Sequence, residues 1–187
     1  MDDARSRLVE STQELLWERG YTGTSPRAIQ ERAGVGQGSM YHHFSGKADL
    51  ARTAIGRTAE EMAPRSRRHL DGPGSPLARL QAYLRAERDV LRGCRLGRLV
   101  QDQEILADPQ LREPIDEVFS GAIDRLAAVL REGQEAGEVR ADVDPEQVAV
   151  MLLTVIQGGY VLARAHQDEA RFTAAVEGAL TLVAAPR

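Results

Sequence analysis

The sequence predicts an all-α protein of about nine helices, and three observations support this class. Apolar residues recur at helical spacing between the breaks, and no run alternates in the way of a half-buried strand. Several helix starts consist of a capping Ser or Asp followed by proline, as at Ser25, Asp108 and Asp144. A chain of 187 residues with 42% apolar and 28% charged residues is ordinary for a globular protein with one or two cores.

Three short helices are expected at the start of the chain. The first ends at Gly20, the second begins at Ser25 and ends at Gly34, and the third covers Gln37–Phe44. Glycine at position 34 suits a tight turn between the second and third helices. The apolar residues with the spacing to pack these two helices together are Ala28, Ile29, Ala33, Val35, Met40 and Phe44. The arrangement is that of a helix-turn-helix with a supporting first helix.

The rest of the chain reads as six further helices. A fourth, at about residues 46–63, starts at a Ser45 cap and is expected to be disturbed or ended by Pro64. After a loop at 71–76, helices are expected at 77–91, at 96–107, from Pro109 and from Pro145, and along the stripe 172–183. The helix from Pro145 is apolar on nearly every face. It therefore needs cover from a deep core or from a second subunit.

Charge is distributed unevenly along the chain. Residues 1–68 hold 11 basic and 9 acidic residues (+2), whereas residues 69–187 hold 13 and 19 (−6), which sum to the net charge of −4. A mildly basic head on an acidic body favours a nucleic-acid-reading module joined to a second domain. The single cysteine excludes an intrachain disulfide framework.

Several classes of protein are disfavoured. We find no nucleophile elbow, phosphate loop, zinc-protease motif or paired carboxylates in a defined context, so neither an enzyme nor a cofactor is expected. The apolar run 148–163 is short and interrupted for a membrane span. The charged N-terminus lacks the apolar core of a signal peptide, so a cytoplasmic location without membrane contact is expected.

The third helix and its flanks carry side chains suited to double-stranded DNA. Gln37 can donate and accept together, which suits an adenine edge in the major groove, and Gly38 permits a close backbone approach. The other expected contacts have hydroxyl, imidazole or cationic groups suited to phosphate, namely Arg27, Ser39, Tyr41, His43 and Lys47, with His42 at the surface or in contact. Tyr41 as a core aromatic is the alternative. A metal site at the adjacent histidines is disfavoured, because neighbouring helical residues face different directions and no partner has ligand spacing.

Residues 5–55 resemble the DNA-binding domain of the tetracycline-repressor (TetR) family. The match runs through the leucines of the first helix, GY and TS, I-x-x-x-AGV, GS-M-YHHF and K-x-x-L. One position departs from the pattern, because Gly36 stands where the family commonly has Ser or Thr. The C-terminal part is similar to a subgroup with a Gly-Cys motif opening the sixth helix and an I-Q-G-G motif in the eighth, here Gly93-Cys94 and 156–159.

The resemblance implies a one-component transcription regulator, most simply a repressor. It implies a DNA-binding domain at residues 1–50, a ligand-binding and dimerisation domain at 51–187, and a homodimer formed through the eighth and ninth helices. Such a dimer would bind a near-palindromic operator and leave it when a small, largely apolar effector binds. The alternative is a structural DNA-binding protein that uses the same head without an effector.

Candidate effector contacts lie in the C-terminal part of the chain: Cys94, Leu99, Gln103, Phe119, Ile123, Met151, Val155 and Tyr160. Cys94 lies between two arginines that favour a reactive thiolate, which allows an oxidant or electrophile sensor; a small buried apolar residue is the alternative. Three arginines at positions 92, 95 and 98 are interpreted either as an anion site or as a solvated face.

Overall fold

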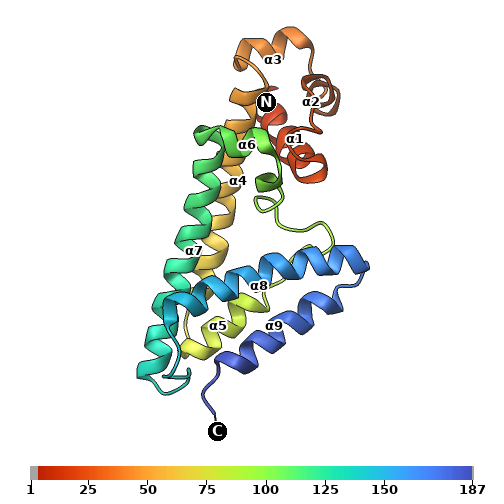
Figure 1. The fold of residues 1–187 in the computed structure, drawn as a ribbon. Helices are drawn as coiled ribbons and strands as arrows, with labels where there is room; N and C mark the ends of the chain where they lie inside the picture. The colour runs from red at the N-terminus through yellow and green to blue at the C-terminus, as the bar shows by residue number, and fades with distance from the viewer. Residues whose placement is uncertain (1–3, 187) are drawn as a thin grey trace. The chain divides into compact units, whose positions relative to one another are not determined.

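The computed structural model describes residues 4–186, and their secondary structure is helical (Figure 1). Apart from a single isolated β-bridge between Val139 and Ala184, the described residues contain no strand, which confirms the all-α class. The helices are α1 (Ala4–Arg19), α2 (Pro26–Ala33), α3 (Gln37–His43), α4 (Lys47–Leu70), α5 (Pro76–Leu84), the 3-10 turn η1 (Leu99–Gln101), α6 (Gln103–Ala107), α7 (Pro109–Glu135), α8 (Pro145–His166) and α9 (Ala170–Val183).

The chain divides into two compact units. The first holds the residues up to Glu61 together with Cys94–Glu117, and the second holds Met62–Gly93 and the residues from Val118 onward. The long helices α4 and α7 contribute to both units. In the first unit, α1, α2 and α3 gather at the N-terminal part of α4 (Figure 1).

Local sequence signals set the short helices of the first unit. The Ser25 hydroxyl accepts a hydrogen bond from the N–H of Ala28 at 3.1 Å, and Pro26 occupies the first position of α2. α2 ends at Gly34, which adopts the left-handed conformation (φ 62°, ψ 39°). Both ends therefore fall where the sequence predicts them.

The core of the first unit contains most of the apolar residues expected to join α2 and α3. Ile29 and Met40 are fully buried, Ala33 and Phe44 are nearly so, and Ala28 and Val35 are half-buried. Leu8 of α1 is also fully buried. Complete burial of one such side chain stabilises a fold by about 1.5–3 kcal/mol, so this small core fixes the orientation of α3.

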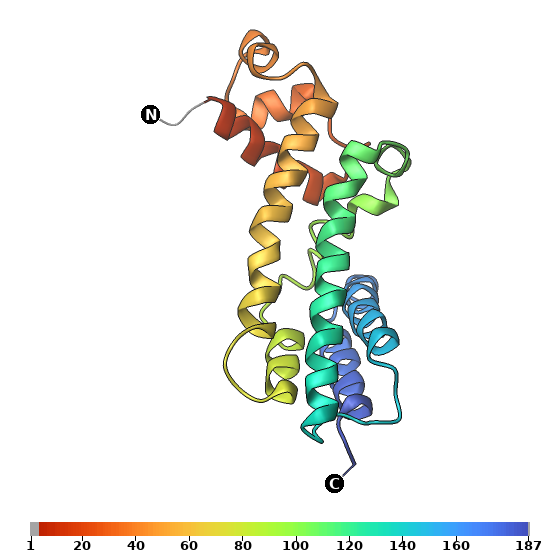
Figure 2. The same ribbon diagram turned by 90° about the vertical axis from the view of Figure 1, so that its left-hand side faces the viewer.

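In the second unit, α8 and α9 lie side by side as a hairpin (Figure 1 and Figure 2). Its core is apolar and draws on five helices, with fully or nearly fully buried members that include Leu70, Leu80, Leu84, Leu126, Leu130, Leu152, Ile156, Phe172, Val176 and Leu180. Gly159 of α8 lies against the Phe172 ring of α9, where an added Cβ would be 2.8 Å from the Phe172 Cδ2 atom. Glycine is therefore what allows the two helices to approach each other here.

Several large apolar side chains of the hairpin are exposed. Val161 and Leu162 of α8 are 66% and 50% exposed, and Leu182 of α9 is 63% exposed. α8 is long and apolar enough to cross a membrane by length and composition, with a mean hydropathy of 1.6 over its best 18 residues. Its buried face nevertheless packs into the core of the second unit, as expected for a helix of a globular bundle.

The predicted end of the fourth helix was wrong. We expected a helix at about 46–63, but α4 begins at Lys47 and continues through Pro64 to Leu70. Proline removes only one backbone donor, and the Ser66 hydroxyl donates to the nearby carbonyl of Ala63 at 3.0 Å. Leu70 is fully buried in the second unit. Burial of the Leu70 side chain in the last turn offsets the lost hydrogen bond.

The predicted fifth and sixth helices are shorter than expected. α5 ends at Leu84 rather than at 91, because the Arg88 guanidinium donates to the carbonyls of Tyr83 (2.6 Å) and Leu84 (3.0 Å). These bonds satisfy carbonyl groups at the helix end, as a C-terminal cap does. The sixth predicted helix, at 96–107, is divided into η1 and the five-residue α6.

Candidate nucleic-acid interface

Helix α3 presents one polar face and buries the other. Gln37, Gly38, Tyr41 and His42 are exposed, while Ser39 and His43 are half-buried. Tyr41 is 51% exposed, which excludes its interpretation as a core aromatic. The helix therefore displays the side chains that the sequence predicts for DNA contact.

The buried face of α3 is held by its neighbours. The amide of Gln30 lies 3.3 Å from the Sδ atom of Met40, and the Phe44 N–H donates to the Met40 carbonyl at 3.0 Å. The guanidinium of Arg5 lies over the Phe44 ring at 5.4 Å from its centroid. The start of α3 has no side-chain cap, because Gly36 occupies the N-cap position.

Arg27 lies in the first turn of α2, on the surface. Its side chain is 87% exposed, and its Nε atom is 2.8 Å from the Glu31 carboxylate. The hydrogen bond that Arg27 donates to Glu31, followed by the charge of Glu31, raises the pKa of Arg27. An exposed pair of this kind contributes little stability, so the guanidinium is able to turn toward a phosphate.

Lys47 lies in the first turn of α4 and rests on an aromatic ring. Its ammonium nitrogen is 3.9 Å from the centroid of the Tyr21 ring, and Tyr21 is buried at the turn that follows α1. Burial, followed by the charges of Glu104 and Asp108, raises the pKa of Tyr21 above its usual value of 10.0. The phenol therefore stays neutral, and its ring face offers a site for a cation.

The start of α4 differs from the predicted Ser45 cap. The Asp49 carboxylate accepts hydrogen bonds from the N–H of Ser45 at 3.0 Å and from its hydroxyl at 3.3 Å, and it also pairs with Arg52 at 2.6 Å. Ser45 is thus a donor to Asp49 rather than an acceptor from the helix. The Ser45 N–H bond, followed by the Arg52 bond, lowers the pKa of Asp49.

We predict that the Asp49 carboxylate contributes acid sensitivity to the first unit. Because its pKa is lower in the folded chain, its contribution is present above the unfolded value of 3.8 and is lost as the pH falls through the folded value. Asp49→Asn is expected to flatten the dependence of the melting temperature on pH below about pH 4. Glu60→Gln, at an exposed position of the same helix, serves as the control. An unchanged pH profile in Asp49→Asn would contradict the assignment.

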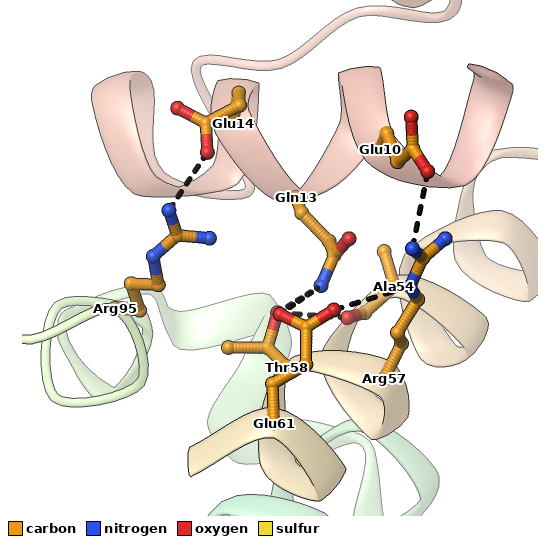
Figure 3. Close-up of polar contacts among 8 residues, drawn as sticks. All are labelled: Glu10, Gln13, Glu14, Ala54, Arg57, Thr58, Glu61 and Arg95. Carbon is orange, nitrogen blue, oxygen red and sulfur yellow. Dashed lines mark hydrogen bonds and ion pairs between the residues drawn. The ribbon is translucent and has the colours of Figure 1, made fainter. Parts of the chain in front are cut away.

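Polar contacts that the sequence analysis missed hold α1 against α4 (Figure 3). The Gln13 amide donates to the Thr58 hydroxyl at 3.0 Å and to the Glu61 carboxylate at 3.3 Å. Arg57 bridges Glu10 at 3.0 Å and Glu61 at 3.2 Å. Gln13 and Thr58 are both buried, so these bonds satisfy groups that water cannot reach. In the sequence Gln13 stands within the polar run 10–14, so nothing marks it as a buried residue.

A second missed set of contacts joins α1 and its following turn to the segment after Cys94. The Asp102 carboxylate accepts from the N–H groups of Tyr21 (2.8 Å) and Thr22 (3.3 Å). Arg95 pairs with Glu14 at 2.9 Å, as Figure 3 shows, and its guanidinium lies 4.1 Å from the centroid of the Trp17 ring. No motif or periodicity connects positions so far apart in the chain.

The candidate effector contacts fall in both units. Cys94 and Leu99 are buried and Gln103 is exposed, all in the first unit. The other five are half-buried in the second unit. Four of them pack against its core, namely Ile123, Met151, Val155 and Tyr160, and the fifth is Phe119. Their contact with an effector stays a prediction.

The surroundings of Cys94 fit a small buried residue. Its side chain is 9% exposed, and its sulfur accepts a hydrogen bond from the N–H of Gly97 at 3.2 Å. Arg95 is engaged by Glu14, and Arg92 lies 3.9 Å from Asp89.

The adjacent rings of His42 and His43 form an edge-on pair, and no group of three potential metal ligands occurs among residues 4–186.

Comparison with known families agrees with this geometry. Residues 8–54 match the family described as "Bacterial regulatory proteins, tetR family". Residues 76–179, more than half of the chain, match "Tetracyclin repressor-like, C-terminal domain". The first match contains α2, α3 and the start of α4.

Individual relatives are regulators as well. The chain is 34% identical over 153 residues to the transcriptional regulator AcuR of Cereibacter sphaeroides, covering 78% of this chain and 69% of that protein. It is 30% identical over 178 residues to the transcriptional repressor DhaR of a Mycobacterium species, covering 88% and 84%. The crystal structure of a regulatory protein TetR from Rhodobacter sphaeroides superposes with a TM-score of 0.83 at 29% identity, covering 96% of this chain and 98% of that one.

Proposed function

This chain belongs to the TetR family of DNA-binding transcription regulators, and we propose that it acts as a homodimeric repressor that a small, largely apolar effector releases from its operator. The observation that carries the proposal is the polar, exposed face of α3 on a buried apolar anchor. In this proposal the two α3 helices of a dimer enter successive major grooves about 34–36 Å apart. Cytoplasmic residence follows from this role.

The expected DNA contacts divide into base reading and phosphate positioning. Gln37 stands at the first position of α3, where an exposed amide can meet an adenine edge beside the open backbone at Gly38. Tyr41, His42, His43 and Ser39 supply donors for phosphate oxygens. Arg27 and Lys47 lie in the first turns of α2 and α4, where the positive end of the helix dipole adds to their charge.

The dimer contact is assigned to α8 and α9. The exposed apolar side chains of these helices would otherwise remain in water, and Gly158 and Gly178 lie on the same two helices with no atom within 4 Å of an added Cβ. Small residues among exposed apolar ones favour close packing against a second helix pair. Two copies related by a two-fold axis would bury this face twice, once from each subunit.

Release by an effector requires a difference in affinity between two conformers. An effector that favours the conformer with mismatched reading heads lowers operator occupancy, and a coupling of about 1–3 kcal/mol changes affinity about 5–150-fold. Half-buried candidates around the core of the second unit, such as Ile123 and Met151, have the apolar character for such a ligand. Proteins named as repressors among the relatives favour repression over activation.

The predicted DNA contacts of α3 can be tested with a DNA duplex that the wild-type protein selects from a random library. Gln37→Ala is expected to weaken binding to that duplex about 10–100-fold and to relax preference at one base position, because one bidentate contact contributes about 1–3 kcal/mol of discrimination. Arg19→Ala, at an exposed position of α1, is the control and is expected to leave base preference unchanged. Equal binding of wild type and Gln37→Ala would exclude Gln37 as a reading residue.

The same duplex separates the repressor from the alternative, an effector-independent structural DNA-binding protein. Band shifts are repeated with a panel of small apolar compounds. The proposal expects at least one compound to release the protein and, by reciprocity, to bind less tightly when DNA is present. Binding that no compound alters would favour the structural protein.

A further inference from the structure

The hydrogen-bond partners of the Asp102 carboxylate are unusual for its position in the chain. It stands directly before α6, at the position where aspartate ordinarily caps a helix, yet it makes no capping hydrogen bond to α6. Its two oxygens instead accept the backbone N–H groups of Tyr21 and Thr22, which lie about 80 residues away in the chain. A side chain that makes a distant hydrogen bond in place of the expected local one is often part of a functional site.

The turn that follows α1 is shaped to receive this carboxylate. Gly20 has a φ of 74°, in the left-handed region, and a Cβ added there would lie 2.7 Å from the Asp102 Oδ2 atom. Any side chain at this position would be both strained and in collision with the carboxylate. The glycine, the two N–H donors and Asp102 thus form one contact between the turn and the segment before α6.

Tyr21 connects the same turn to α4. Its backbone N–H is held by Asp102, and its buried ring carries the Lys47 ammonium 3.9 Å from the centroid. Two contacts therefore separate Asp102 from Lys47, all within the first unit. The ring gives the flexible lysine side chain a defined position at the start of α4.

We propose that Asp102 is a positioning residue for DNA binding: it fixes the turn at Gly20–Thr22, and through the Tyr21 ring it orients Lys47 toward a phosphate. The inference rests on the proposed phosphate contact of Lys47. It also assigns a role to the segment Cys94–Asp102, whose Arg95 holds α1 through Glu14. A shift of this segment would change the Lys47 contact without touching α3.

A double-mutant cycle measures this connection. Binding of the selected duplex is followed as a function of salt for wild type, Asp102→Ala, Lys47→Ala and the double variant. Loss of one phosphate contact lowers the slope of log affinity against log salt by about 0.9. Asp102→Ala is expected to lower the slope nearly as much as Lys47→Ala and to weaken binding several-fold. The double variant is expected to bind no more weakly than Lys47→Ala alone.

Two further variants separate positioning from a general loss of structure. Tyr21→Leu keeps the backbone N–H for Asp102 but removes the ring, so it is expected to reproduce the reduced slope. Asp116→Ala removes an exposed carboxylate of the same unit and controls for net charge; its slope is expected to match wild type. Amide exchange at Tyr21 and Thr22 is expected to accelerate in Asp102→Ala but not in Tyr21→Leu or Asp116→Ala.

Several outcomes would overturn the inference. Additive effects of Asp102→Ala and Lys47→Ala would show that the two act independently. A wild-type slope in Asp102→Ala or in Tyr21→Leu would do the same. Suppose that Lys47→Ala reduces the slope of log affinity against log salt and Asp102→Ala does not. In that case only the proposed role of Asp102 fails. If the wild-type protein does not bind DNA, the proposed function fails as well.

Discussion

A chain carrying Val161→Glu and Leu162→Glu is expected to be monomeric and to lose high-affinity operator binding. The Val161 side chain is more than half exposed and the Leu162 side chain is half exposed. Both lie on α8, on the face assigned to the dimer contact. Each contributes about 1.5–3 kcal/mol when buried, and two-fold symmetry counts each substitution twice. The introduced carboxylates add a further penalty for burial without a partner. The dimer dissociation constant should therefore rise at least about a thousand-fold.

Sedimentation velocity over a range of protein concentrations measures this change, and band shifts on the selected duplex measure its consequence. A monomer engages one half-site only, so the operator affinity should fall by at least about 100-fold while helix content is retained. Ala82→Glu, at an exposed position of α5, adds one carboxylate elsewhere in the second unit and should leave the dimer intact. A double variant that sediments as wild type would place the dimer contact on another face.

Gly159→Ala and Gly56→Ala are expected to change stability in opposite directions. At Gly159 an added Cβ would lie 2.8 Å from the Phe172 ring, and that ring is 6% exposed and packs on Tyr160 with centroids 5.1 Å apart. The ring has little room to move, so overpacking should cost about 1–3 kcal/mol. Gly56, in α4, has nothing within 4 Å of an added Cβ. Alanine there should stabilise by up to about 1 kcal/mol through helix propensity.

Urea denaturation of the two variants beside wild type tests the pair, with binding of the selected duplex as a check on the folded state. Gly159→Ala should lower the unfolding midpoint and Gly56→Ala should raise it. A midpoint of Gly159→Ala at or above the wild-type value would mean that α8 and α9 tolerate a wider separation than the hairpin shows.

The sequence predicts a helix boundary in this chain where a local signal marks it. Ser25, Asp108 and Asp144 precede the starts of α2, α7 and α8, because a cap and a following proline act within one turn. The ends of α4 and α5 depend on distant partners. Burial of Leu70 carries α4 past Pro64, and Arg88 closes α5 by bonding to its carbonyls. The local sequence pattern predicts neither the burial of Leu70 nor the hydrogen bonds of Arg88.

The candidate interface shows the same division. The exposed side of α3 is predictable, because Met40 and Phe44 mark the buried side and helical geometry places Gly38 and His42 opposite to it. The contacts of Asp102 with the turn after α1 join positions about 80 residues apart. A single sequence contains no signal for such a pairing, since an aspartate before a short helix is equally explained as its cap.

The Arg27–Glu31 pair on α2 has a consequence for how the protein responds to its ionic surroundings. Glu31 already neutralises the guanidinium in the free protein, so a phosphate that engages Arg27 takes the place of an existing anion. Added salt weakens the Arg27–Glu31 pair as well as the Arg27–phosphate contact. The exchange therefore gains less free energy from the release of condensed cations than binding by an unpaired arginine would. Arg27 should accordingly contribute to anchoring while adding little to the sensitivity of binding toward salt.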